Sequence, residues 1–311
     1  MSQTLPMRTL LCALFVLSAV RPVSAQQASG LSFLRVGPNA EAGAMGDAQV
    51  AHTRDAFSTF WNPSGLVEAP RNSASVSYYA WVLDTSTYSA AARLRLGERG
   101  AIGLFATAMA SGDLEARSGP GDPDGTFGVQ FVSAGASYGR RIGPLRAGVT
   151  AKHLSERIYT RTAYGYAFDF GLQADVLGGG LVTGAVLQNV GKMSELESES
   201  TALPRAVRVG VAVYPLDVLL SDDEATLLRT LISAEVAHFV NSETTRFHVG
   251  LSVEILDTID LRGGYMTNDA LRGPSLGLGF AFERAVFDYA YVPFEGGFQG
   301  PGHLLTLGYQ W

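Results

Sequence analysis

Hydrophobic and polar side chains alternate with a period of two along most of this chain. Between Tyr164 and Val176, every second residue is apolar or aromatic, and the residues between them are small or polar. Residues 207–214, 246–255 and 275–283 show the same alternation. Successive side chains of a β-strand point to opposite faces, so this period predicts strands that have one apolar face. The pattern therefore predicts an all-β protein.

Turn residues divide this pattern into expected strands, many of them about 9–11 residues long, the length that a tilted transmembrane strand requires. We expect about 14 strands, and an even number is typical of bacterial single-chain barrels. The fold predicted for residues 73–311 is therefore a transmembrane antiparallel β-barrel. The expected strands are 73–82, 86–97, 100–109, 128–140, 144–154, 163–176, 180–190, 204–214, 227–239, 244–255, 258–266, 273–283, 285–292 and 303–311.

The connections between these strands alternate in length. Short periplasmic turns and longer outer loops are the asymmetry expected of a bacterial barrel. Residues 215–226 depart from it, because they should form a short turn; Ser221 and Glu224 make a capping-box pattern that predicts a small helix there. The short connections are 97–100, 141–144, 177–180 and 283–284, and the long ones are 110–127, 191–203 and 293–302.

Charged residues recur on the polar face of the strands, among glycine and other small residues. A soluble exported β-sandwich also alternates, but charges on the second face favour a polar lumen inside an apolar exterior. Such charges could select a polar solute or hold a plug, and pairing with one another is the simpler role. The charged residues that we expect to face the lumen are Arg146, Lys152, Asp169, Arg208, Arg246, Glu254, Asp260 and Arg262.

Composition supports a membrane location. The chain has 311 residues, 47% of them hydrophobic and 17% charged, whereas soluble domains usually have about 25% charged residues. Residues 1–25 are typical of a secretory signal peptide, with Arg8, an apolar core from Leu10 to Val20 and a small-residue cleavage site ending at Ala25. That core is shorter than the roughly 20 residues of a transmembrane helix. We expect the exported chain to contact outer-membrane lipid through its strands.

No feature of the sequence points to catalysis. The only cysteine, Cys12, lies within the signal peptide, which excludes disulfides and thiolate sites from the exported chain. The five histidines have no metal-ligand spacing, and neither a nucleophile elbow nor a phosphate-binding loop is present. Residues 122–125 could bind calcium weakly, although a plain turn is the simpler interpretation. A net charge of −6 does not favour nucleic acid. We expect no enzyme, cofactor or metal.

Several separated motifs resemble those of one family. These motifs are residues 33–37, 44–48, 61–66, 75–79, 188–191, 288–294 and 303–311. In this order they are similar to the PorV/PorQ family, relatives of the FadL-type fatty-acid transporters of the outer membrane. The resemblance implies a fourteen-stranded barrel with an N-terminal plug, and a non-enzymatic accessory or scaffold role in type IX protein secretion. Its expected partners are secretion components or secreted cargo.

The alternative function is FadL-like transport of a small hydrophobic molecule across the outer membrane. It requires an apolar pocket beside the plug. Because a fourteen-stranded barrel leaves a channel unless something fills it, we expect residues 26–72 to form that plug. The proline within this segment could instead only end a helix that packs on the wall. The candidate plug residues are Met45, Gly46, Trp61, Asn62, Pro63 and Gly65.

The final strand ends in aromatic residues. Leu305, Leu307, Tyr309 and Trp311 fall on one face, and aromatic residues are common at membrane boundaries. This end resembles the C-terminal strand by which bacterial barrels are recognised for assembly, with Tyr309 and Trp311 as the expected signal. An ordinary edge strand is the alternative.

Overall fold

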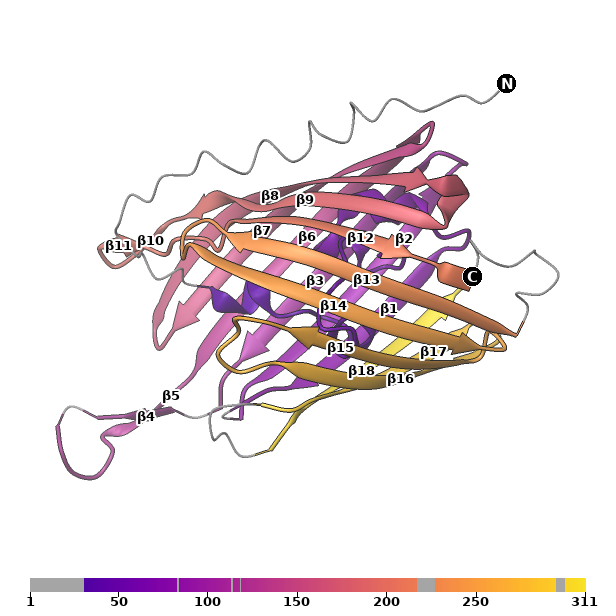
Figure 1. Ribbon diagram of the computed structural model, residues 1–311. Helices are drawn as coiled ribbons and strands as arrows, with labels where there is room; N and C mark the ends of the chain where they lie inside the picture. Colours follow the sequence, from indigo (N-terminus) through magenta and orange to yellow (C-terminus); the bar gives the residue numbers. More distant parts are fainter. Residues whose placement is uncertain (1–30, 83, 113, 118, 217–226, 295–299) are drawn as a thin grey trace, which may run out of the picture.

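A computed structural model describes residues 31–82, 84–112, 114–117, 119–216, 227–294 and 300–311. Fourteen strands form one closed antiparallel barrel in the order β1-β18-β17-β16-β15-β14-β13-β12-β9-β8-β7-β6-β3-β2 (Figure 1). The barrel closes where the first strand pairs with the last, with Val76 opposite Leu307. Because β1 and β18 pair with each other, both edges of the sheet are hydrogen-bonded, as a structure surrounded by lipid requires. The predicted fold is confirmed.

The barrel strands lie close to their expected positions. They are β1 Ser73–Ala80, β2 Ser86–Leu96, β3 Gly100–Ala110, β6 Val129–Ile142, β7 Leu145–Ile158, β8 Arg161–Val176, β9 Leu181–Met193, β12 Ala206–Val213, β13 Leu228–Phe239, β14 Thr244–Ile255, β15 Ile259–Met266, β16 Pro274–Phe282, β17 Ala285–Val292 and β18 Gly302–Gln310.

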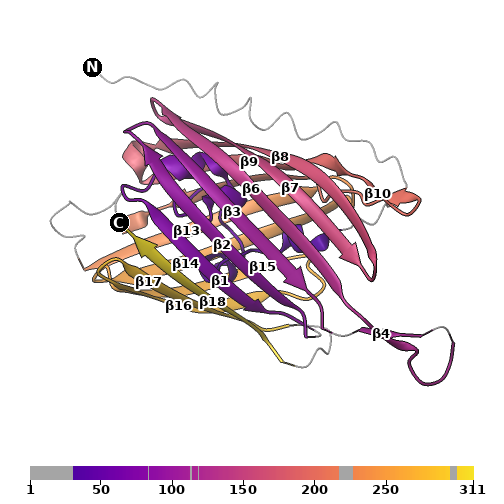
Figure 2. The ribbon, with the colours of Figure 1, turned by 180° about the vertical axis from the view of Figure 1, so that it is seen from behind.

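Two small hairpins were not predicted. β4 (Leu114–Ala116) pairs with β5 (Gly125–Phe127), and β10 (Glu195–Leu196) pairs with β11 (Glu199–Ser200). Both lie within long connections, and the β4–β5 hairpin projects away from the barrel (Figures 1 and 2). The connections β3–β6, β9–β12 and β17–β18 share one end, here called the long-loop rim. The turns β2–β3, β6–β7 and β16–β17 share the other end, the short-turn rim.

Some expectations lie wholly or partly outside the described residues. They are the signal peptide over residues 1–25, the start of the expected plug over residues 26–30 and most of the helix expected within residues 215–226. No helix of the described residues is long and apolar enough to cross a membrane.

Apolar side chains cover the outside of the barrel. On β8, Phe170 is 51% exposed, while its neighbour Asp169 is fully buried. Leu276 on β16 and Val209 on β12 are likewise exposed on the outer surface. The apolar rows therefore do not meet in a central core, as they would in a β-sandwich. This arrangement, with apolar residues outside and polar residues inside, suits a hydrocarbon environment.

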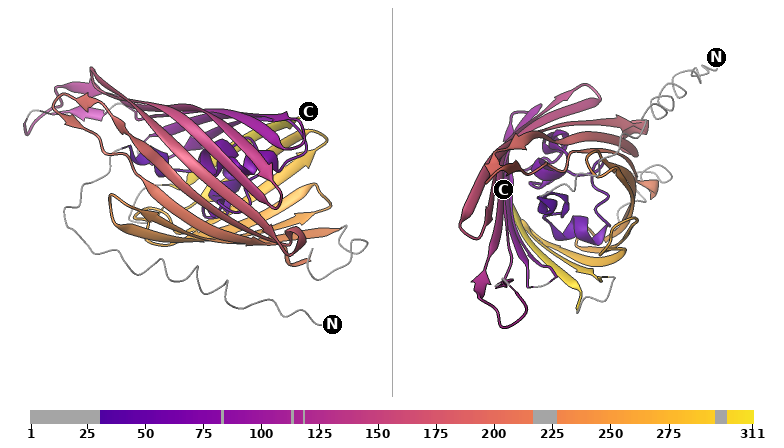
Figure 3. Two further views of the ribbon diagram at one scale, coloured as in Figure 1. Left: turned by 90° about the horizontal axis from the view of Figure 1, so that it is seen from above. Right: turned by 90° about the vertical axis from the view of Figure 1, so that its left-hand side faces the viewer.

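Residues 31–72, called here the lumenal segment, lie inside the barrel (Figure 3). They form η2 (Ser32–Arg35), α1 (Ala40–Ala44), α2 (Ser58–Trp61) and η3 (Pro63–Val67). Pro63 ends α2 and begins η3, because proline lacks an amide hydrogen and suits a first helical position. α1 packs against β15–β18, and η3 packs against β3 and β6–β8. A further short helix, η4 (Leu177–Gly179), lies in the β8–β9 turn.

Candidate functional site

Glycines of the wall allow the lumenal segment to approach the strands closely. A Cβ atom on Gly171 or Gly148 would lie less than 3.0 Å from atoms of Asn62 or Pro63, a separation that real Cβ atoms essentially never show. Glycine at these positions is therefore required by space. The same holds for other inward-facing glycines that meet the segment, namely Gly103, Gly139, Gly184, Gly210, Gly250, Gly264 and Gly277.

Asn62 connects the lumenal segment to two strands. Its side-chain oxygen accepts hydrogen bonds from Ser64 N (3.2 Å) and Ser64 Oγ (2.7 Å), which caps η3. Its Nδ2 donates to the carbonyl oxygens of Val50 (2.8 Å), Leu172 (3.2 Å) and Ala185 (3.4 Å). Asn62 is fully buried, so each of these bonds satisfies a group that water does not reach.

The other candidate plug residues are also buried. Trp61 donates from Nε1 to Asn39 Oδ1 at 2.9 Å, and the Arg208 guanidinium lies 4.8 Å from its ring centroid. Gly65 packs against the backbone of Thr53, while Met45 and Gly46 lie against Gly250, Gly264 and Tyr265. All six candidate residues therefore contact either another part of the lumenal segment or the wall.

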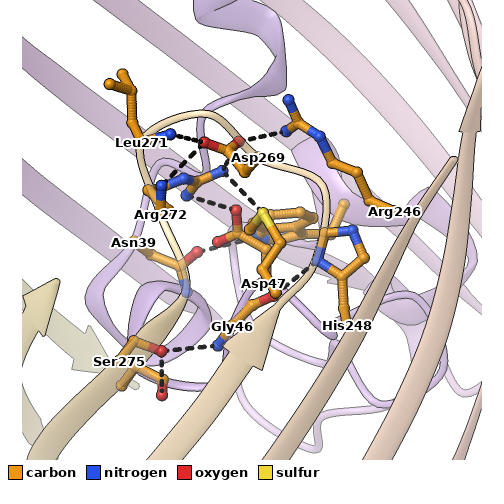
Figure 4. A network of polar contacts seen from close by, with 12 residues as sticks. Asn39, Gly46, Asp47, Arg246, His248, Asp269, Leu271, Arg272 and Ser275 are labelled. Atoms are coloured by element: carbon orange, nitrogen blue, oxygen red, sulfur yellow. Dashed lines mark hydrogen bonds and ion pairs between the residues drawn. The ribbon is translucent and has the colours of Figure 1, made fainter. Parts of the chain in front are cut away.

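A polar network joins the lumenal segment to the long-loop rim (Figure 4). Asp47 lies 2.8 Å from Arg272, and Asp269 lies 2.7 Å from Arg246. Burial acts to raise the pKa of Asp269, but Arg272 and Arg246 hold it below its usual range. His248 Nδ1 lies 2.7 Å from the carbonyl oxygen of Gly46. These contacts tie a loop that follows β15 to the turn that follows α1.

The predicted lumen charges mostly form ion pairs. Lys152 lies 2.6 Å from Asp169, Arg262 lies 3.0 Å from Asp260, and Arg208 pairs with Glu235. Arg146 contacts Glu68 and Asp175. Arg246 joins the network described above, and Glu254 lines a cavity near the short-turn rim. The structure brings Glu254, Asp260 and Arg262 together at that cavity and distributes the other five around the wall.

Two wall features were not among the predicted site residues. Arg93 is fully buried and donates to the carbonyl oxygens of Leu66, Ala69 and Arg71. Its position on the inward face of β2 is the same feature from which the other lumen-facing charged residues were predicted. The second feature is a β-bulge in β9, where Asn189 has φ 60° and the register to β8 shifts.

The bulge turns two consecutive side chains inward. Gln188 donates to the carbonyl oxygens of Phe60 (2.8 Å) and Trp61 (3.2 Å). Asn189 accepts a hydrogen bond from Lys152 at 2.8 Å. Strict alternation would have pointed one of the two side chains outward. Within the motif at residues 188–191, Gln188 therefore holds the lumenal segment, and Asn189 bonds the wall.

An outer pocket of about 350 Å³ opens near the long-loop rim. Its apolar lining includes Phe33 and Phe131, whose rings stack with centroids 5.4 Å apart, together with Trp81 and Met109. Three guanidinium groups and one carboxylate form its charged part, those of Arg35, Arg246, Arg272 and Asp269. The pocket can therefore enclose the apolar part of a small molecule and contact a polar group at one end of that molecule.

An inner cavity of about 370 Å³ lies near the short-turn rim and shares no lining residue with the outer pocket. Its lining contains charged residues from both the lumenal segment and the wall. Glu41, His52, Arg54, Asp55 and Glu68 are contributed by the lumenal segment. The buried interior of that segment separates the two spaces.

The chain ends on the outside of the short-turn rim. Tyr309 and Trp311 are 51% and 45% exposed, and their rings stack with centroids 6.4 Å apart. Trp311 exchanges two backbone hydrogen bonds with Asn72, each 3.1 Å long. Nothing in this geometry distinguishes an assembly signal from an ordinary edge strand, so this expectation stays a prediction.

No protein-family model matches the chain, and no curated protein matches it in sequence. Solved structures are similar in fold. The toluene transporter TbuX of Ralstonia pickettii has a TM-score of 0.59 at 15% identity, covering 88% of this chain and 98% of TbuX. The toluene transporter TodX of Pseudomonas putida has a TM-score of 0.59 at 10% identity, covering 88% and 96%. A FadL homologue of Pseudomonas aeruginosa has a TM-score of 0.54 at 10% identity, covering 88% and 98%. At these identities, the chain shares the barrel fold of these proteins.

Proposed function

We propose that this chain forms a passage for small hydrophobic molecules across an outer membrane. The observation that carries the proposal is the outer pocket, a partly aromatic space lined by the start of the lumenal segment and by the wall, in a barrel of this fold. The solved barrels of similar fold include two described as toluene transporters. Their fold supports the transport hypothesis better than the secretion hypothesis.

In this proposal, the long-loop rim faces the cell exterior, as longer outer loops do in bacterial barrels. A hydrophobic molecule would leave water for the outer pocket, where Phe33, Phe131 and Met109 cover its apolar surface. Burial of apolar surface contributes about 25 cal/mol per Å². Because the lumenal segment lies inside the barrel, it must move before the molecule can continue.

Uptake by purified protein in liposomes tests this proposal. Radiolabelled toluene is a suitable probe, and Phe131→Glu is the test variant because it places a carboxylate in the outer pocket. Phe127→Glu is the matched control, since Phe127 lies on the β4–β5 hairpin and does not line the pocket. We expect Phe131→Glu to lower saturable uptake about tenfold or more, and Phe127→Glu to leave it unchanged. Equal uptake by wild type and empty liposomes would refute the proposal for this probe class.

A role in type IX secretion remains the second candidate. It rests on the sequence motifs that resemble the PorV/PorQ family, and the projecting β4–β5 hairpin offers exposed backbone for protein contacts. The solved structures of similar fold add no support for it. Affinity purification of the tagged barrel from its own outer membrane tests this role. Recovery of secretion components with the wild type, and their loss when residues 114–127 are replaced by a short glycine linker, would favour it.

A further inference from the structure

Exposed basic side chains gather on one side of the long-loop rim. Among the described residues, those at this end of the wall all lie on or directly beside four consecutive strands, β7, β8, β9 and β12. The remaining wall strands expose no lysine or arginine at this end, as far as the structure describes them. Positive charge is therefore concentrated on one part of the rim. The four residues are Arg157, Arg161, Lys192 and Arg205.

The strand register places some of these side chains on the outer surface. His153 on β7 pairs with Tyr166 on β8, and Tyr166 pairs in turn with Lys192 on β9. Directly paired residues share a face of the sheet, and Tyr166 is 48% exposed on the outside. Two strand spacings separate His153 from Lys192, which is about 10 Å. Arg157 follows His153 by four residues on β7, so it points to the same side.

Arg205 extends this row to the next strand. The side chain of Asn189, at the bulge of β9, donates to the carbonyl oxygen of Pro204 at 3.0 Å, which fixes the chain beside β9. The carbonyl oxygen of Arg205 accepts a hydrogen bond from the amide of Val240 at 2.9 Å. Arg205 alternates with outward-facing Val207, so its side chain also points outward. We call the surface formed by His153, Arg157, Lys192 and Arg205 the basic face.

The charges of the basic face are not neutralised by nearby carboxylates. None of Arg157, Lys192 and Arg205 forms an ion pair within 4.0 Å with another of the described residues. Arg161 differs, because its Nε lies 3.2 Å from Glu197. The basic face can therefore bind an anion from outside the chain. The other carboxylates of this region belong to the β10–β11 hairpin beyond β9, and they are Glu195 and Glu199.

The outward side chains of β8 show the depth of the basic face in the membrane. Phe170 and Phe168 are exposed and apolar, and Tyr166 follows them toward the long-loop rim. Tyrosine is enriched at the membrane–water boundary, at the level of the lipid head groups. Lys192 is paired with Tyr166 and thus lies at this level, whereas Arg157 lies further out. Their long side chains can keep an apolar stem on the wall and place the charge among the head groups.

We propose that the basic face binds the phosphate groups of an anionic lipid in the membrane leaflet at the long-loop rim. Arginine matches phosphate oxygens with two parallel hydrogen bonds, and lysine adds a point charge. The acyl chains of the same molecule would lie on Phe168 and Phe170, which continue the surface toward the middle of the membrane. A soluble anion would use only the charges, whereas a lipid uses both surfaces. The inference does not depend on the proposed passage.

Native mass spectrometry of the purified barrel in detergent tests this proposal, with diphosphoryl lipid A as the probe. We expect wild type to retain at least one molecule of the probe. The triple variant Arg157→Gln/Lys192→Gln/Arg205→Gln should weaken binding about tenfold or more, because each basic residue near an anionic lipid adds to the attraction. The variant Arg157→Lys/Lys192→Arg/Arg205→Lys keeps every charge and should retain most of the affinity.

The matched control is Arg99→Gln/Arg140→Gln/Arg284→Gln, which removes the same charge from exposed arginines at the short-turn end of the barrel. This control should bind the probe as tightly as wild type. Heat-modifiable migration confirms that each variant is a folded barrel. Unchanged affinity in the first triple variant would overturn the basic face as a lipid site, as would an equal loss in the control. Displacement of the probe by millimolar inorganic phosphate would also overturn it, because the site would then bind a free anion and not a lipid.

Discussion

Lys152 on β7 and Asp169 on β8 form a buried ion pair inside the wall, with Nζ 2.6 Å from Oδ2. Asp169 is fully buried and also accepts a hydrogen bond from the amide of Asn189 at 2.8 Å. Lys152 and Asp169 lie on neighbouring strands, and the bulge at Asn189 brings a third polar group to them. Because both residues belong to strands of the wall, we expect the pair to affect the stability of the barrel more than the passage of molecules through it.

Removing one partner of this pair should destabilise the barrel strongly. Lys152→Met leaves the Asp169 carboxylate buried without its cation, which costs about 3–5 kcal/mol in comparable cases. The double variant Lys152→Met/Asp169→Leu removes both charges and should recover most of the loss. Urea unfolding in liposomes, followed by tryptophan fluorescence, measures the difference. Equal stability of Lys152→Met and wild type would show that the pair contributes little.

The wall glycines that meet the lumenal segment should not tolerate a side chain. In Gly171→Ala, the new methyl group would overlap Asn62, and overpacking of this kind costs about 1–3 kcal/mol. We expect residues 31–72 to become more accessible to added protease while the barrel stays folded. Gly263→Ala is the control, because a Cβ there would lie an ordinary 3.6 Å from Leu276. Identical digestion of the two variants would contradict the close fit seen at Gly171.

Asp55 should make stability depend on pH. Burial raises its pKa from 3.8 to about 7, and the carboxylates of Glu41 and Asp288 add to this. The folded state thus favours the protonated form. The resulting stabilisation is complete below the unfolded pKa near 3.8 and is lost as the pH rises through about 7.

We therefore expect the unfolding temperature in detergent to fall between pH 5 and pH 8 by less in Asp55→Asn than in wild type. Asp122→Asn serves as the control, since Asp122 is exposed in the β4–β5 hairpin loop. The unfolding temperature of this control should fall by as much as that of the wild type. A drop of the same size in all three proteins would remove Asp55 as a source of the pH dependence.

The two C-terminal aromatic residues test the assembly prediction. If Tyr309 and Trp311 are recognised during insertion, the variant Tyr309→Ala/Trp311→Ala should accumulate as unfolded chain. The heat-modifiable fraction in isolated outer membranes should fall severalfold. Leu307→Ala is a suitable control, because Leu307 is 56% exposed in the same outward row of β18. Equal folded fractions for the two variants would leave the aromatic end as an ordinary edge.

The sequence by itself determined the strands, their number and which face of each is apolar. Alternation between Tyr164 and Val176 reports the two faces directly, because the side-chain period of a strand is a local property. Turn residues limited most strand ends to within a few positions. The sequence did not show that Gln188 and Asn189 both point inward, because a bulge breaks the alternation on which the prediction depended.

Only the tertiary structure decided which residues meet inside the barrel. Asp47 and Arg272 are 225 positions apart, and the sequence pattern around each gives no sign of the other. Their contact depends on closure of the sheet, on the register of every strand pair and on the path of the lumenal segment. The inward-facing glycines illustrate the same limit of prediction from the sequence. Alternation placed them on the inward face, but the close approach of Asn62 and Pro63 to Gly171 and Gly148 explains why that face carries no side chain there.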